Sequence, residues 1–452
     1  MSTVDSFFAL SSAPGEAALA LLRMSGPLVP MVAKEALGLQ DPLPARRARY
    51  VNYRAVDGAI IDDLVAVYYP PEGSFTGDAL LELTPHGNPL IVQRILEDLQ
   101  QRGLRSAEPG EFTRTAFLNG RLDLSQAEAI GDLIHARSER ALEAARRQMQ
   151  GAMGEQMSTL SAHLLQIMAH VEAYIDFPEE DLPSEDHSGP LADLKALISG
   201  VEALLATRHY HSVLHDGLKT MIVGAPNVGK SSLINALTGH RRAIVSDQPG
   251  TTRDAVSDRI MVGGHWVDIL DTAGLRESED AIECMGMAMT LELAEQADHF
   301  LLTLDSTLPP PPLPTVLAER LNASNTLVVI NKSDLAEATA HDDFLAEIPH
   351  VSVSALCGDG LLELRQLWEA QLRRRFAEGI HDGVTINARH AAALARARDA
   401  LVAARKKLVD GEPSELAAAD LRTALDAFGE VVGKIDVESM LDTLFKNFCI
   451  GK

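Results

Sequence analysis

A glycine-rich octapeptide near the middle of the chain restricts the possible folds more than any other feature of this sequence. Residues 224–231 read Gly-Ala-Pro-Asn-Val-Gly-Lys-Ser and fit the pattern G-x-x-x-x-G-K-[ST]. They follow an apolar, strand-like run, Leu218–Val223, and precede a run with helical apolar periodicity, Ser232–Leu237. A strand, a glycine-rich loop and a helix in this order predict a phosphate-binding loop (P-loop). In such a loop backbone amides surround the phosphates, Lys230 reaches the β and γ oxygens, and the Ser231 hydroxyl ligates Mg²⁺.

Two further motifs concern the γ-phosphate and its metal ion. Asp271-Thr-Ala-Gly274 follows the strand-like run His265–Leu270. An acid at a strand end can hold the Mg²⁺ shell, and Gly274 lets a backbone amide approach the γ-phosphate. Between this motif and the P-loop, residues 249–254 read Pro-Gly-Thr-Thr-Arg-Asp, and Thr252 is the predicted second hydroxyl ligand of Mg²⁺.

The last two motifs identify the base. Asn331-Lys-Ser-Asp334 follows the apolar run Thr326–Ile330. The Asp334 carboxylate can accept hydrogen bonds from the two N–H donors on the Watson–Crick edge of guanine, whereas adenine would leave it unpaired. Residues 354–356, Ser-Ala-Leu, follow another β-like stretch and place the Ala355 amide where it can meet guanine O6. Together the motifs predict that the chain binds GTP.

The predicted GTP-binding residues all lie in these motifs. They are Asn227, Val228, Gly229, Lys230, Ser231, Ser232, Ser246, Asp247, Gln248, Pro249, Gly250, Thr251, Thr252, Asp271, Thr272, Ala273, Gly274, Asn331, Lys332, Asp334, Ser354, Ala355 and Leu356.

The residues that would assist hydrolysis stay open at this level. Ras-like GTPases orient the attacking water with a Gln after the D-x-x-G motif, and this chain has Leu275 there. Acidic residues just downstream are alternatives, or they form a solvated loop and helix start; they are Glu277, Glu279, Asp280 and Glu283. Transition-state charge can be neutralised by Arg253, by Arg276, or by a cation bound through Asn227, and spacing does not choose between them.

Length and composition limit the class of protein. The 452 residues suggest two to four domains at roughly 100–200 residues each. A formal charge of −24 with only 4 % aromatic residues argues against a chain that coats nucleic acid through its overall field or by base stacking. Three widely spaced cysteines form no disulfide framework, and the start of the sequence has neither a basic signal-peptide region nor a long apolar run. We therefore expect a soluble, reduced, cytoplasmic protein without a membrane segment.

Changes of residue pattern along the chain predict its domains. Short β-like runs such as Ile60–Tyr69 and Ala79–Thr84, with one helix-like stretch at Pro89–Arg102, predict an α+β domain over residues 1–120. Residues 121–214 and 381–452 are rich in Ala, Leu and Arg, which predicts helices that include Ala388–Lys407 and Val437–Phe448. Strand–helix alternation over 215–380 predicts a Ras-like domain with a mostly parallel sheet and helices on both faces. The expected fold is multidomain, α/β and α, with one helical domain interrupted by an inserted GTPase domain.

Several segments outside the GTPase motifs carry a family resemblance. They are Leu22-Arg-Met-Ser-Gly26, Ser74-Phe-Thr-Gly77, the run from Phe117 to Leu124, the stretch Tyr174–Pro183 and the terminal Cys449-Ile-Gly-Lys452. With these segments, the sequence resembles the MnmE (TrmE) family of tRNA-modifying GTPases over nearly its full length.

The resemblance implies an activity and its requirements. The N-terminal domain would bind tetrahydrofolate and dimerise. The enzyme would install a (carboxymethyl)aminomethyl group on C5 of the wobble uridine of certain tRNAs. The family does this with the flavoprotein partner MnmG (GidA), GTP, Mg²⁺, K⁺ and a folate, either 5,10-methylenetetrahydrofolate or the bound analogue 5-formyl-tetrahydrofolate. GTP hydrolysis would drive transient dimerisation of the GTPase domains, with K⁺ in place of an arginine finger.

The resemblance also implies roles for particular residues. The K⁺ ligands would be Asn227, Ser246, Gln248 and Thr251, and the folate-binding residues would be Arg23, Glu82, Arg121 and Lys452. Catalysis would involve Lys230, Glu283, which positions the water indirectly, and Cys449, for which a small buried hydrophobe is the alternative role. The sequence departs from the family at Arg121, where Lys is common, at Gln248 and Pro249, and at residues 85–88, which read Pro-His-Gly-Asn instead of G-H-G-G.

Alternatives to an RNA-modifying enzyme come from other classes of GTPase. A ribosome-assembly GTPase like Era or Der would carry a KH-type module, whose basic G-x-x-G loop is not found after the GTPase motifs. A dynamin-like GTPase would need a membrane anchor. Basic clusters such as 46–49, 137–147, 373–375 and 406–407 are tRNA-binding candidates, and ion-paired helix faces are the alternative interpretation. Binding of a reduced folate by residues 1–120 would separate the first hypothesis from the other two.

Overall fold

The architecture is described from a computed structural model. It describes residues 5–39, 43–176, 188–239, 256–271, 294–335, 344–377, 384–433 and 451. The chain divides into two compact units, the first made of residues 1–131, 149–159 and 428–452 and the second of residues 132–148 and 160–427. Each unit therefore combines segments that are far apart in the sequence.

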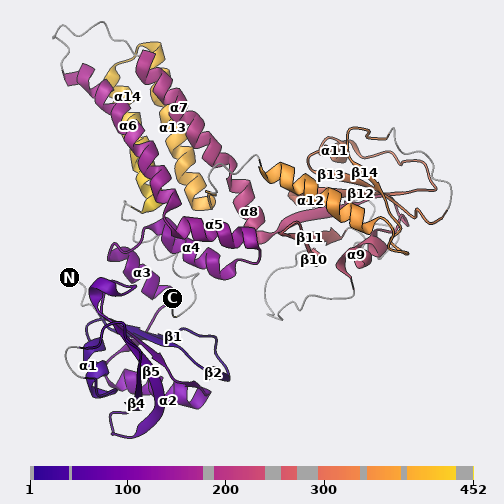
Figure 1. Ribbon diagram of the computed structural model, residues 1–452. Coiled ribbons are helices and arrows are strands. Elements are labelled where there is room, and N and C mark those ends of the chain that lie inside the picture. The colour runs from indigo at the N-terminus through magenta and orange to yellow at the C-terminus, as the bar shows by residue number, and fades with distance from the viewer. Residues whose placement is uncertain are drawn as a thin grey trace, which may run out of the picture. The chain divides into compact units, whose positions relative to one another are not determined.

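The first unit is built on a six-stranded sheet in the order β4-β5-β6-β3-β1-β8 (Figure 1). All neighbouring pairs are antiparallel except β1 and β8. Its strands are β1 Phe7–Leu10, β3 Leu22–Ser25, β4 Arg49–Arg54, β5 Ile60–Tyr69, β6 Leu80–Thr84 and β8 Arg105–Ser106, and a small second sheet pairs β2 Ala17–Leu19 with β7 His86–Gly87.

Helices cover both faces of this sheet. They are α1 Val29–Glu35, α2 Pro89–Gln101 and α3 Glu111–Leu118, and a 3₁₀ turn, η1, spans Pro71–Gly73. Because side chains alternate along a strand, Leu81 and Leu83 join one core with α1 and α2, while Leu80 packs with Phe112 of α3 in another. The sequence predicted β5, β6 and α2. The expectation of only one helix was wrong, since α1 is short with a proline in its first turn and α3 begins after a left-handed glycine.

The carboxylate of Asp98 on α2 holds the edge of this sheet. It accepts hydrogen bonds from the Tyr53 hydroxyl at 2.8 Å, the Val56 amide at 2.7 Å and Nε of Arg102 at 2.7 Å, and Asp98 is only 3 % exposed. Burial, followed by the nearby Asp98 charge, raises the pKa of Tyr53. All three donors would lose a partner if this carboxylate were removed.

The helical segments are long and amphipathic. They are α4 Leu124–His135, α5 Glu139–Met149, α6 Ala152–Asp176, α7 Ser188–Ala206, α8 Arg208–Asp216, α13 Ala388–Asp410 and α14 Ser414–Val432. In the second unit, α7 and α13 pack side by side, and each buries apolar residues, among them Leu194 and Val201 on α7 and Leu394 and Leu401 on α13 (Figure 1). The predicted helix Ala388–Lys407 is confirmed within α13, whereas the prediction at Val437–Phe448 lies outside the described residues.

The second unit also holds a six-stranded sheet in the order β10-β11-β9-β12-β13-β14. Its strands are β9 Leu218–Val223, β10 Val256–Val262, β11 His265–Asp271, β12 His299–Asp305, β13 Thr326–Asn331 and β14 His350–Ser352. All neighbours are parallel except β10 and β11. The central strands β12 and β13 are buried throughout, as expected for parallel strands covered on both faces. The covering helices include α9 Lys230–Thr238, α11 Thr315–Ala318 and α12 Leu361–Ala377.

This architecture confirms the predicted fold class of α/β and all-helical parts with a mostly parallel sheet. The predicted strand Leu218–Val223 coincides with β9, and the predicted run Thr326–Ile330 falls within β13. In the described part of the chain, each helix is too short or too polar to traverse a lipid bilayer.

Replacing Asp98 tests its role in the N-terminal unit. Asp98→Ala leaves the Arg102 guanidinium and the Tyr53 hydroxyl without this partner, so we expect the free energy of unfolding to fall by about 3–5 kcal/mol. Hydrogen exchange of residues 49–69 in the full chain measures the loss of protection. Glu97→Ala, an exposed position one residue earlier on α2, is the matched control. Equal protection in the two variants would contradict the proposed role of the Asp98 carboxylate.

Candidate functional site

The nucleotide motifs meet at one edge of the second sheet. The parallel strands β11, β9, β12 and β13 are neighbours in the sheet, and they end at Asp271, Val223, Asp305 and Asn331. Registers pair Asp271 with Ile222 and Asp305 with Asn331, so the carboxyl ends of these strands are adjacent. In open α/β sheets ligands bind at this edge.

Two glycines let the P-loop take its path. A Cβ on Gly224 would lie 2.3 Å from the Thr303 carbonyl oxygen on β12, so the backbone approaches the sheet more closely than a side chain allows. Gly229 has φ +93°, and a Cβ there would lie 2.3 Å from Nδ2 of Asn331. Asn227 is exposed and also left-handed, with φ +64°. A loop of this shape presents its amides inward to an anion.

The ammonium group of Lys230 is hydrogen-bonded within the P-loop. Nζ of Lys230 donates to the carbonyl oxygens of Gly224 and Ala225, each at 2.9 Å. Lys230 begins α9, and the next two residues, Ser231 and Ser232, are exposed. A helix amino terminus with an ammonium group and accessible hydroxyls fits a polyphosphate and its divalent metal.

Asn331 connects three of the motifs. It is 2 % exposed, and its Nδ2 donates to the Val228 carbonyl of the P-loop at 2.8 Å. Its Oδ1 accepts from the Ala355 amide at 3.0 Å. The side chain therefore fixes the P-loop and residues 354–356, the base loop, to the end of β13. Sequence reasoning placed Asn331 among the ligand-binding residues and did not foresee this connecting role.

An ion pair between Lys332 and an acid outside the motifs supports the segment after β13. Nζ of Lys332 lies 2.6 Å from Oδ2 of Asp305, the last residue of β12. Burial alone would raise the pKa of this carboxyl, but hydrogen bonds from Lys332 and Thr307 lower it to about 2. Lys332 has φ +66°, and its carbonyl accepts from the Ser306 hydroxyl at 2.8 Å. An acid ending an apolar strand was the sequence signal that could have identified Asp305.

The base-recognition residues differ in exposure. Asp334 and Leu356 are exposed, Ser354 is fully buried, and Ala355 is intermediate. The Ser354 hydroxyl accepts from the Cys357 amide at 3.1 Å and shapes the turn. The Asp334 carboxylate is accordingly accessible to a base, while Ser354 supports the loop.

Many predicted site residues lie outside the described residues. They are Ser246, Asp247, Gln248, Pro249, Gly250, Thr251, Thr252, Thr272, Ala273, Gly274, Glu283, Cys449 and Lys452, and the same holds for Arg253, Leu275 and Arg276. Of Asp271 only the backbone is described, as the end of β11.

A second polar group of residues lies on the N-terminal sheet. Arg23 and Glu82 face each other across β3 and β6, with Nε and Oε1 2.8 Å apart and side chains 29 % and 20 % exposed. The Tyr69 hydroxyl donates to Oε2 of Glu82 at 3.1 Å. Burial, and then the charge of Glu82, raises the pKa of Tyr69. These two predicted folate-binding residues are thus brought together.

Arg121 and Gly451, near the end of the chain, contact different parts of the first unit. The Arg121 guanidinium donates to the carbonyl oxygens of Glu72 at 2.7 Å and Ser74 at 3.0 Å, so it fixes the loop before β6. Gly451 approaches the end of β1, where the Ser11 hydroxyl donates to its carbonyl at 2.9 Å. Gly451 is therefore close to the strand that neighbours β3.

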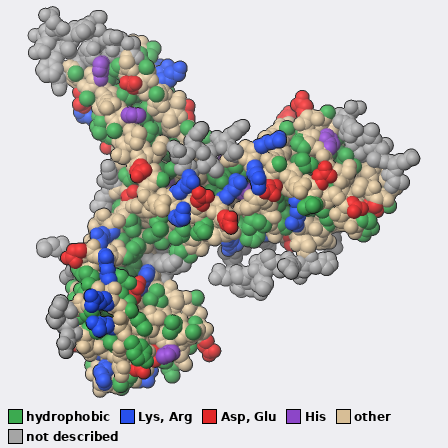
Figure 2. All heavy atoms as spheres, viewed as in Figure 1, with side chains coloured by type: hydrophobic (Ala, Val, Ile, Leu, Met, Phe, Trp, Pro, Cys, Tyr) green, Lys and Arg blue, Asp and Glu red, His purple; other side chains and the backbone are tan. Residues whose placement is uncertain are grey.

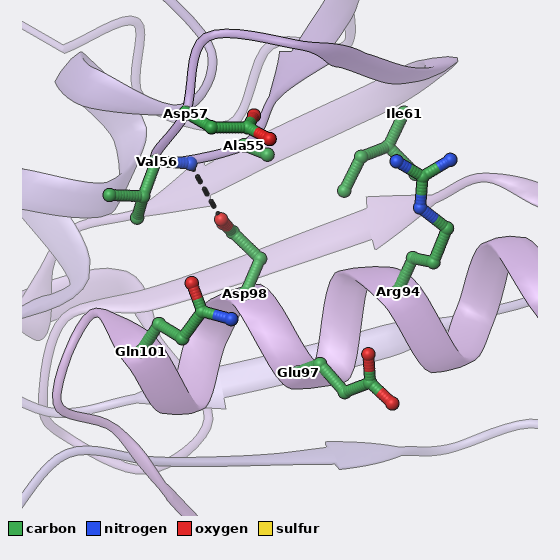
Figure 3. A pocket seen from close by; sticks show the side chains of 8 residues that line it. All are labelled: Ala55, Val56, Asp57, Ile61, Arg94, Glu97, Asp98 and Gln101. Carbon is green, nitrogen blue, oxygen red and sulfur yellow. Dashed lines mark hydrogen bonds between the residues drawn. The ribbon is translucent and has the colours of Figure 1, made fainter.

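A separate hollow of about 270 Å³ lies beside α2 (Figure 3). It is lined by Ala55, Val56, Asp57, Ile61, Arg94, Glu97, Asp98 and Gln101, none of which is a predicted ligand. Figure 3 shows the Asp98 carboxylate bonded to the Val56 amide, and its other partners were given above. A carboxylate with three protein donors is occupied by the fold, so we place no site here.

Cations in three of the basic clusters pair with acids on their own or a neighbouring helix. Arg147 lies 2.8 Å from Glu143, Arg373 pairs with Glu369, and Lys407 lies 2.7 Å from Asp420 of α14. On the face shown in Figure 2, basic and acidic side chains lie interspersed. For these three cations the structure favours ion-paired helix faces over dedicated RNA contacts.

The parallel sheet and its edge define a GTPase domain inserted into a helical chain. Two family models match this sequence: "GTP-binding protein TrmE N-terminus" over residues 6–121 and "MnmE helical domain" over residues 124–449. A tRNA modification GTPase MnmE of Opitutus terrae is 47 % identical over 452 residues, covering 99 % of both chains. The protein of the same name from Akkermansia muciniphila is 40 % identical and covers 98 % of both chains. The chain belongs to the MnmE (TrmE) family of tRNA modification GTPases, which confirms the resemblance found in the sequence.

A glycine substitution tests the geometry of the P-loop. Gly229→Ala adds left-handed strain of roughly 1–2 kcal/mol and displaces the Asn331 side chain, so we expect GTP affinity to fall at least tenfold. Titration with a fluorescent GTP analogue measures the affinity. Gly239→Ala is the matched control, because Gly239 also has a positive φ, +53°, but open space around its Cβ position. Similar losses in both variants would show that contact with Asn331 is unimportant.

Proposed function

We propose that this GTPase uses a one-carbon folate and a flavoprotein partner to install a (carboxymethyl)aminomethyl group on C5 of the wobble uridine of certain tRNAs. One observation carries the proposal: a single chain holds a guanine-nucleotide edge and a separate cation–carboxylate pair, Arg23–Glu82, on another sheet. A switch GTPase alone has no use for the second site. The partner in this proposal is MnmG (GidA), the chain acts as a homodimer, and the reaction takes place in the cytoplasm.

The nucleotide edge supplies positioning and charge. Lys230 and the amides at the start of α9 would hold the phosphates, and Asp334 and the Ala355 amide would hold the guanine. The hydroxyls of Ser231 and Thr252 would ligate Mg²⁺, and K⁺ would be held by Asn227, Ser246, Gln248 and Thr251. Bound, these ions supply positive charge where negative charge develops on the phosphates. The exposed, left-handed Asn227 supports this assignment, and Glu283 is assigned to orienting the water.

The N-terminal pair supplies recognition of the folate. A carboxylate such as Glu82 can accept from the pterin N–H donors, and cations such as Arg23 and Lys452 suit the glutamate tail. The partly exposed position of Arg23 and Glu82 and the nearby Gly451 support this assignment. Arg121 is assigned to the same site, where its bonds to the Glu72 and Ser74 carbonyls would also shape the wall of the site. Cys449 is assigned a catalytic role near the folate and the uridine.

A comparison of salts tests the assignment of K⁺. We expect GTP hydrolysis by the purified chain to be at least tenfold faster in KCl than in NaCl at equal ionic strength, because a bound cation neutralises transition-state charge. Asn227→Ala is expected to lose this difference while its rate in NaCl stays near that of the unmodified chain. Equal rates in the two salts would overturn the cation mechanism and make Arg253 the leading candidate.

Binding of 5-formyl-tetrahydrofolate tests the second site. We expect Glu82→Gln to weaken binding at least tenfold in calorimetry, because the neutral amide loses its charge toward the ligand and toward Arg23. The control Glu97→Gln, in the hollow beside α2, should bind normally. Weaker folate binding by Glu97→Gln would instead assign the folate to the hollow beside α2. No folate binding by the unmodified chain would favour a ribosome-assembly GTPase.

A further inference from the structure

Two histidines and an aspartate meet near the start of the GTPase domain. His211 and His215 lie on α8 and Asp132 lies near the end of α4. One potential ligand atom of each lies within 4.8 Å of the other two. Nδ1 of His215 is 3.8 Å from Oδ1 of Asp132. All three residues belong to the second unit, although Asp132 is far from the histidines in sequence.

We propose that Asp132, His211 and His215 form a binding site for Zn²⁺ or a similar divalent transition metal. Neutral imidazole and carboxylate are ligands that suit Zn²⁺, whereas Mg²⁺ prefers oxygen ligands only. Three protein ligands leave the fourth tetrahedral position for water. The site is separate from the nucleotide edge and is independent of the proposed folate chemistry.

The geometry of α8 favours this pair of histidines. Residues four apart lie on the same face of a helix, and His-x₃-His is a recurrent metal-binding spacing. The two rings are already close, with centroids 4.3 Å apart and planes tilted by 40°. A tetrahedral Zn²⁺ with ligands about 2.0–2.1 Å away keeps ligand atoms about 3.3 Å apart. Side-chain rotations that shorten these separations by up to about 1.5 Å would bring the three groups to this distance.

The surroundings orient the ligands and keep the site accessible. The Thr385 hydroxyl, in a residue 3 % exposed, lies 3.2 Å from Nδ1 of His211 and fixes that ring, as neighbouring oxygens do in metal sites. The side chains of His215 and Asp132 are 18 % and 25 % exposed, so an ion can enter from solvent. The opposite side of α8 is buried through Tyr210, Val213 and Leu214, which holds the helix in place.

The three residues lie where the GTPase domain connects to the helical segments. α8 leads through Gly217 into β9 and the P-loop, and Thr385 precedes α13, where the chain has left the GTPase domain. Asp132 comes from the helical segment before both. A bound ion would therefore link Asp132 directly to α8 and, through the His211–Thr385 contact, to the connection before α13.

Metal titration of the full-length, tag-free chain tests the proposal. After removal of metals with a chelator, Co²⁺ is added and its visible d–d absorption is followed, and Zn²⁺ is then used to displace it. We expect one Co²⁺ per chain with a four-coordinate spectrum, and affinity at least tenfold weaker in each of His211→Gln, His215→Gln and Asp132→Asn. His163→Gln, an exposed histidine on α6, is the matched control and should bind normally.

Two further measurements separate metal binding from loss of structure. Binding of a fluorescent GTP analogue should be retained in all variants, which shows that the unit is folded. Hydrogen exchange of residues 208–223 should slow on addition of Zn²⁺ to the unmodified chain and not to His215→Gln. Unchanged affinity in the three ligand variants, or no stoichiometric Co²⁺ binding by the unmodified chain, would overturn the proposal.

Discussion

The nucleotide edge depends on the buried carboxamide of Asn331. Its donor and acceptor both bind backbone groups, one in the P-loop and one in the base loop, so neither loop can move without breaking a buried hydrogen bond. An amide can do this because it offers both kinds of group, which an aspartate or a leucine of similar size does not. The Lys332–Asp305 pair next to it holds the end of β12 to the segment that follows β13. Phosphate and base recognition are consequently coupled before any ligand arrives.

Local patterns in the sequence predicted this edge well. The strand before the P-loop, the helix after it and the apolar runs of the sheet follow from short-range periodicity and from the need of glycine at Gly224 and Gly229. Contacts between distant residues could not be predicted in this way. Asp305 and Lys332 meet only because β12 and β13 are parallel neighbours, and Asp132 meets His211 only after the helices pack. The short helix α1 was missed because tertiary packing, not propensity, stabilises it.

The N-terminal unit illustrates two uses of charged groups in a sheet. Asp98 and Arg102 are buried, fully hydrogen-bonded and structural, whereas Arg23 and Glu82 form an equally short pair that remains partly open to solvent. Distance alone would not separate the two pairs. Accessibility does, because a ligand can compete only for groups that it can reach. This difference places the candidate ligand site on β3 and β6 and away from the hollow beside α2.

The two edges of the sheet in the GTPase domain make different contacts. At its amino-terminal edge, the Trp266 indole donates to the Arg137 carbonyl at 2.6 Å, and Nη1 of Arg140 lies 3.1 Å from Nε2 of His265. Strand β11 therefore begins against α5 and the residues just before it. At its carboxyl edge the same strands carry the nucleotide motifs, about 20 Å away for a strand of this length. The strand β11 therefore connects a contact with α5 at one end to Asp271 of the nucleotide edge at the other.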